Sequence, residues 1–272
     1  MSLIRNITKA EIAEFKTNGV VHLQNFFDPK WASMLRDLAD FVLKNPGKLA
    51  NELANKSGQG RFFSDTFLWH QNDEFKKFIY NSPAVVVVRQ VIESSKINII
   101  FDRFLIKEPN TNEPTAWHHD LTYWPIKGPN VVTLWLALDN VTEQTGSMEF
   151  VKGSHLWDKR YHPVAFVDPT KYSTPSHPSQ ISIIDVTSLN LFGSIMYPAT
   201  APYTTVCSSI LPVVTKAPSN AGVPTKLGGP AIMSSMTLGQ ISRRCCGNLP
   251  LIRAHRSIAR YGQLYGQRPS LQ

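Results

Sequence analysis

The stretch that decides the fold is Trp117-His118-His119-Asp120-Leu121-Thr122-Tyr123-Trp124-Pro125, which lies between two strand-like segments, 97–106 and 131–139. Residues i and i+2 of a β-strand point to the same face, so we predict that His118 and Asp120 present an imidazole and a carboxylate side by side. These are two-thirds of the 2-His-1-carboxylate triad, which holds iron(II) and leaves positions open for other ligands. The H-x-D pattern alone is a weak signal, because such a pair more often belongs to a polar strand face.

The first 185 residues contain helical patterns followed by strand-like ones. Helices are expected from the capping box at Thr8–Glu11 to Gly19, from Pro29 to about Lys44, and over 73–80 and 83–94. Strands are expected over 20–27, 61–69, 97–106, the His118 segment, 131–141 and 147–151. Helices first and many strands after predict an α+β fold with a β-barrel-like core and the N-terminal helices packed outside.

Four motifs in a fixed order make the metal interpretation more specific. They are Phe104–Pro109, Pro114–Trp124, Leu134–Asp139 and Gly146–His155. Together they resemble the phytanoyl-CoA dioxygenase family, whose members are 2-oxoglutarate-dependent non-haem iron oxygenases, over roughly residues 10–185. The resemblance implies a double-stranded β-helix (jelly-roll, cupin-like) core and iron(II) bound by His118 and Asp120.

The resemblance also implies where 2-oxoglutarate would bind. It places this co-substrate near Trp135 and near the strand that carries Leu105 and Lys107. A downstream arginine would hold the far carboxylate in a bidentate pair, and Arg256 is the nearest candidate. The expected activity is an Fe(II)- and 2-oxoglutarate-dependent dioxygenase that uses O2 to hydroxylate a small organic molecule or an acyl-type substrate.

The third iron ligand is the missing part of this interpretation. The family has a downstream histidine, followed by an Asn-x-Ser/Thr-like step and the arginine, but the resemblance ends after Asp185 and residues 178–254 contain no histidine. A late register places the histidine position near Arg244 or Cys245, and His255 could serve only if the chain took another path. The alternative function is therefore a catalytically impaired dioxygenase-like protein that lacks the distal iron-binding histidine.

The remaining histidines are given no ligand role. His22 lies in the expected strand 20–27 without an evident partner, so we predict a histidine on the strand surface. His155 closes the last of the four motifs, where the resemblance implies a structural role.

The net charge of +8 is unevenly distributed along the 272 residues. Residues 1–185 hold all 20 acidic residues, whereas 186–272 hold none, together with eight basic residues and all three cysteines. We therefore divide the chain into a dioxygenase-like domain, 1–185, and an atypical basic segment, 186–272. Either about 186–250 comes from a shifted reading frame or unspliced sequence, with the fold resumed near 247–272, or the segment is an ordinary basic, Ser/Thr/Pro-rich insertion.

Several classes of protein fit the sequence poorly. No run approaches 18 apolar residues and Met1–Asn6 lacks a signal-peptide core, so a soluble, cytoplasmic protein that does not bind membranes is expected. Three cysteines without a secretory signal argue against a disulfide framework. A nucleic-acid-binding module is the weakest alternative, because the eight basic residues of the C-terminal segment are spread out and no recognition motif accompanies them.

Overall fold

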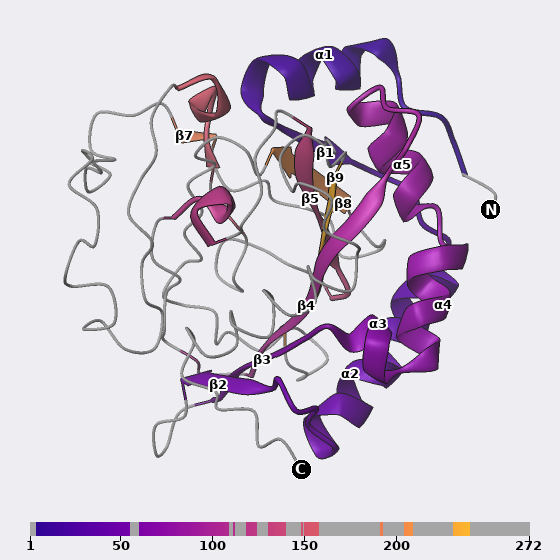
Figure 1. Cartoon of the computed structure of the whole chain (residues 1–272), viewed down its shortest axis with the longest axis vertical. Coiled ribbons are helices and arrows are strands. Elements are labelled where there is room, and N and C mark those ends of the chain that lie inside the picture. Colours follow the sequence, from indigo (N-terminus) through magenta and orange to yellow (C-terminus); the bar gives the residue numbers. More distant parts are fainter. Residues whose placement is uncertain are drawn as a thin grey trace, which may run out of the picture.

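An antiparallel sheet of seven strands, in the order β1-β8-β5-β9-β4-β3-β2, organises the chain in the computed structural model (Figure 1). The structure describes residues 4–54, 60–108, 111, 118–123, 130–139, 148, 150–157, 191–192, 204–208 and 231–239. The strands are β1 Val20–Leu23, β2 Asn51–Ala54, β3 Phe62–Thr66, β4 Asn98–Lys107, β5 Val131–Ala137, β6 Phe150–Val151, β7 Leu191–Phe192, β8 Thr204–Ser208 and β9 Ala231–Gly239. The helices are α1 Lys9–Asn18, α2 Pro29–Lys44, α3 Leu68–Gln71, α4 Asp73–Asn81 and α5 Ala84–Val91, with 3-10 turns at Asp120–Tyr123 and Ser154–Leu156.

The N-terminal helices begin and end where the sequence predicts. The Thr8 hydroxyl accepts a hydrogen bond from the Glu11 backbone N–H at 3.2 Å, and the Glu11 carboxylate accepts one from the Thr8 N–H at 2.8 Å. Gly19, at φ +78°, ends α1 in the left-handed conformation that glycine adopts without strain. Asp28 caps α2 by accepting from the Lys30 N–H at 3.0 Å, and Pro29 occupies the first turn.

One face of the sheet packs against the helices and forms the main hydrophobic core. Even-numbered side chains of β4 and β5, and odd-numbered ones of β1 and β3, belong to one buried cluster with the apolar sides of α2, α4 and α5. Figure 1 shows these helices grouped along one side of the sheet. From the strands, the cluster contains Val21, Leu23, Phe63, Phe104, Ile106, Val132, Leu134 and Leu136.

The opposite face, which we call the site face, carries the alternate residues of the same strands and is more polar. On β4 these are Arg103, Leu105 and Lys107, and on β5 they are Thr133 and Trp135. Leu105 and Met148 pack on Trp135 and Ala137 as a small separate cluster. Strands β6 and β7 pair with each other and form a second, two-stranded sheet.

The C-terminal segment supplies two strands of the central sheet. β8 pairs with β1 and β5, and β9 pairs with β5 and β4. The chain therefore returns to the fold before residues 247–272, which lie outside the described part of the structure. The mixture of helices and strands agrees with the predicted α+β class.

Several local predictions were wrong. Residues 118–123 form two irregular residues and a 3-10 turn instead of a strand. The expected strand 61–69 stops at Thr66 and continues into the short helix α3, whose first N–H is bound by the buried Asp102 carboxylate at 2.8 Å. Strand β2 was not predicted. Within the described residues no helix is long and apolar enough to span a membrane.

Asp102 provides a test of this packing through pH. Burial raises the pKa of Asp102 from 3.8 to about 8, and the nearby Asp65 carboxylate adds to the rise. Between these two pH values the unfolded chain has lost the proton that the folded chain retains, so stability falls as pH rises and levels off above about 8.

We expect Asp102→Asn, which keeps an oxygen acceptor for the Leu68 N–H, to remove this dependence. The free energy of unfolding of the wild type should fall relative to the variant by roughly 1 kcal/mol per pH unit across this window. Urea denaturation of both proteins at pH 5, 6.5 and 8 measures the difference. Parallel pH profiles would show that Asp102 does not hold its proton in the folded state.

Candidate metal centre

His118 and Asp120 lie side by side, although not for the reason that the sequence suggested. The His118 Nε2 atom is 3.5 Å from the Asp120 Oδ1 atom. Because residues 118–123 are not a strand, the 3-10 turn that begins at Asp120, and not strand alternation, brings the two groups together. The two side chains are therefore paired as predicted, but the backbone that carries them is a turn and not a strand.

The distance between the two donor atoms suits a shared metal ion. Two ligands with bonds of 2.0–2.2 Å, set at a right angle around one metal, are about 3 Å apart. The observed 3.5 Å is slightly wider than this distance. The Asp120 side chain keeps 32% of its surface exposed and His118 keeps 13%. Imidazole nitrogen and carboxylate oxygen are donors that iron(II) accepts in facial-triad sites.

A hydrogen bond connects this pair to the sheet. Thr133, on β5, donates its hydroxyl to the Asp120 Oδ2 atom at 3.0 Å. Thr133 is 7% exposed, so the hydroxyl lies at the sheet surface beneath the turn. The ring of Tyr123, at the end of the turn, contacts His118 edge-on with ring centroids 6.0 Å apart.

The surroundings keep Asp120 ionised. Desolvation raises the pKa of its carboxyl, but the hydrogen bond and charge of His118, the Thr133 hydroxyl and the Arg103 guanidinium outweigh that effect, and the pKa is lowered overall. An ionised carboxylate is the form that binds a metal cation.

The predicted co-substrate residues lie on the site face. Leu105 is on β4 and contacts the cluster that contains Trp135 on β5, with β9 between the two strands. Trp135 is 4% exposed, and its indole Nε1 has no hydrogen-bond partner among the described residues. Lys107 is only 1% exposed, and its ammonium lies 4.6 Å from the centroid of the Phe62 ring. Arg256 lies outside the described residues.

The described residues contain no group of three or more metal-binding side chains. His255, the candidate third ligand, lies outside the described residues. His22, predicted to lie on the strand surface, is half-buried on the site face of β1, and this desolvation lowers its pKa to about 4. The structural role expected for His155 agrees with its contacts, since its Nε2 lies 2.9 Å from the Lys16 carbonyl oxygen at the end of α1.

Sequence reasoning missed Thr133 and Arg103. Both could have been found from strand alternation, because Thr133 is two residues before Trp135, and Arg103 is two before Leu105. The hydrogen bond between Thr133 and Asp120 could not have been found from the sequence, because it depends on the turn that replaced the expected strand.

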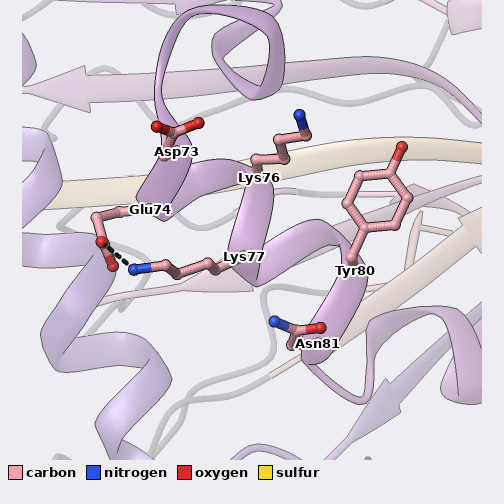
Figure 2. Close-up of a pocket in the computed structure, with 6 residues that line it drawn as sticks. All are labelled: Asp73, Glu74, Lys76, Lys77, Tyr80 and Asn81. Carbon is pink, nitrogen blue, oxygen red and sulfur yellow. Dashed lines mark hydrogen bonds and ion pairs between the residues drawn. The ribbon is translucent and has the colours of Figure 1, made fainter.

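A separate open hollow lies on the helical layer, on α4 (Figure 2). It is lined by Asp73, Glu74, Lys76, Lys77, Tyr80 and Asn81, and Figure 2 shows Glu74 and Lys77 joined as an ion pair. These residues include neither an imidazole nor a thiol, and α4 packs on the face of the sheet opposite the His118–Asp120 pair.

Comparison with known families identifies the chain. Residues 15–188 match the family described as phytanoyl-CoA dioxygenase (PhyH). The chain belongs to the PhyH family. The match includes the His118–Asp120 pair, Lys107 and Trp135, and it ends close to Asp185, where the resemblance seen in the sequence stops. No curated protein matches the chain.

Solved structures share the fold of this PhyH-family chain. A non-haem α-ketoglutarate-dependent carbocyclase, SnoK from nogalamycin biosynthesis, is 17% identical with a TM-score of 0.67, over 88% of this chain and 86% of SnoK. The epimerase SnoN, in complex with Fe3+, α-ketoglutarate and nogalamycin RO, is 19% identical with a TM-score of 0.64, over 85% and 83%. EctD from S. alaskensis with bound Fe is 14% identical with a TM-score of 0.60, over 94% and 86%.

We expect His118→Ala and Asp120→Ala each to abolish tight metal binding, since each removes one of two paired donors. The control is His70→Ala, which removes a histidine from α3 on the helical side of the sheet. Calorimetric titration of the purified proteins with Co(II), an air-stable substitute for Fe(II), measures the change. Equal affinities for all four proteins would place the metal elsewhere.

Proposed function

We propose that this protein is an Fe(II)- and 2-oxoglutarate-dependent oxygenase that uses O2 to hydroxylate a small organic or acyl-type substrate. The observation that carries the proposal is the His118–Asp120 pair, 3.5 Å apart, on the site face of a PhyH-family chain. Solved structures of the same fold with iron or 2-oxoglutarate bound support it. We also propose that the seven-stranded sheet is one half of a double-stranded β-helix.

The proposed roles follow from the chemistry of each side chain. His118 and Asp120 would hold the iron, which with 2-oxoglutarate supplies the oxidising chemistry when bound. Lys107 would offset the charge of a 2-oxoglutarate carboxylate, and the Trp135 N–H would donate a hydrogen bond to it. Arg256 is proposed for the far carboxylate. Leu105, half-buried against Trp135, would exclude water from the same site.

The alternative is a catalytically impaired member of the family. The specific observation in its favour is that residues 178–254, where the family has its distal histidine, contain no histidine. Two ligands hold a metal less tightly than three, so such a protein would bind iron weakly and turn over slowly or not at all.

One experiment separates these two functions. Fe(II) and 2-oxoglutarate added without oxygen should give a weak visible charge-transfer band, and oxygen should then cause succinate release. The band with no succinate would favour the impaired protein. Absence of the band in the wild type, with the same spectrum as Asp120→Ala, would contradict the proposed co-substrate.

The encoding DNA tests the origin of residues 186–250. If that segment comes from a shifted frame or unspliced sequence, a neighbouring frame should encode a histidine followed by Asn-x-Ser/Thr and an arginine. Sequencing the gene and its transcript decides this. Neighbouring frames without that pattern would favour an ordinary insertion.

A further inference from the structure

The two oxygens of the Asp120 carboxylate have different neighbours. Oδ2 accepts the Thr133 hydroxyl at 3.0 Å, whereas Oδ1 faces His118 Nε2 at 3.5 Å. A carboxylate can bind a metal through one oxygen or through both. Here the hydrogen bond occupies the oxygen that points toward the sheet and leaves the oxygen on the histidine side for the metal.

We propose that Thr133 is a positioning residue that makes Asp120 a one-oxygen metal ligand through Oδ1. This inference rests on the proposed function, because it concerns the same metal centre. Thr133 does not touch the metal position in this arrangement. It acts through Asp120, by fixing the rotation of the carboxylate.

The place of Thr133 in the sheet makes it a rigid reference point. β5 is paired on both sides, with Thr133 opposite Cys207 on β8 and opposite Thr237 on β9. The threonine side chain is branched at Cβ and has few accessible rotamers on a strand. The hydroxyl is therefore held at a fixed height above the sheet.

Residues 118–123, which carry His118 and Asp120, need a fixed contact of this kind. His118 and His119 have no regular secondary structure, and Asp120 begins a 3-10 turn of four residues. Without the hydrogen bond the carboxylate could rotate and offer both oxygens to the metal, or turn toward Arg103, whose positive charge acts on it. The hydrogen bond from Thr133 is directional and acts on Oδ2, whereas His118 lies beside Oδ1, so the two contacts together distinguish the two oxygens.

One consequence concerns the open positions of the metal. A carboxylate that binds through one oxygen uses one coordination position, whereas a two-oxygen carboxylate uses two. An oxygenase of this class needs open positions for 2-oxoglutarate and oxygen. Holding Asp120 in the one-oxygen mode therefore preserves the sites at which the co-substrates would bind.

The test compares Thr133→Val, which keeps the shape and removes the hydroxyl, with Thr133→Ser, which keeps the hydroxyl. The matched control is Thr66→Val, a buried threonine on the site face of β3. Co(II) titration gives the metal affinity, and the visible spectrum of the Co(II) protein reports its coordination. Thermal unfolding without metal is measured alongside.

We expect Thr133→Val to bind Co(II) about 10- to 100-fold more weakly, the range typical of lost ligand-supporting contacts, with an altered Co(II) spectrum. Thr133→Ser should retain the wild-type spectrum, and Thr66→Val should match the wild type in both measurements. A purely structural role would lower the unfolding temperature of Thr133→Val without changing its spectrum or affinity.

The outcomes separate this inference from the proposed function. If the wild type binds Co(II) and Thr133→Val has the same affinity and spectrum, the positioning role is wrong and the metal centre stands. If the wild type does not bind Co(II), both are wrong. Should Thr133→Val fail to fold, Thr133→Ala replaces it, because alanine and serine at this position differ only in the hydroxyl oxygen.

Discussion

The pairing of β5 on both sides is the constraint on which the rest of the structure depends. Its two neighbours, β8 and β9, come from the segment beyond residue 185 that carries no acidic residue. β8 also connects β5 to β1, and β9 connects it to β4. Without these strands the sheet would divide into three pieces, and Thr133 and Trp135 would no longer share a surface with Leu105 and Lys107. The surroundings of the His118–Asp120 pair therefore depend on strands from a part of the chain that contains neither residue.

The two faces of the sheet differ in composition: one forms the hydrophobic core, and the other carries charged side chains. The face against the helices is apolar and closely packed, and the buried Asp102, whose pKa is strongly raised, lies there and accepts a hydrogen bond from the first N–H of α3. The site face instead carries Arg103, Lys107 and the Asp120 carboxylate. A buried ammonium such as Lys107 is costly unless an aromatic ring or an anion compensates for lost water. The Phe62 ring supplies part of that compensation.

Sequence patterns predicted the parts of the fold that local chemistry determines. The capping box at Thr8 and Glu11, the Asp28-Pro29 start of α2 and the alternation along β4 and β5 are interactions between residues near in sequence. Two predictions of secondary structure were wrong where contacts between residues far apart in the sequence determine the local conformation. Residues 67–71 became a helix because Asp102, on another strand, binds the Leu68 N–H. Residues 118–123 form a turn that Thr133 contacts through Asp120. Strand alternation predicted correctly that His118 and Asp120 lie side by side, but these residues are not a strand, so alternation is not the cause.

The geometry of the His118–Asp120 pair does not depend on a third metal-binding side chain. His118 and Asp120 are two residues apart, and the contacts that orient Asp120 come from β5 and from the charge of Arg103 on β4. A distal histidine would complete the coordination but is not needed to aim the other two donors. The relative position of His118 and Asp120 is therefore set by the turn and by its hydrogen bond to the sheet.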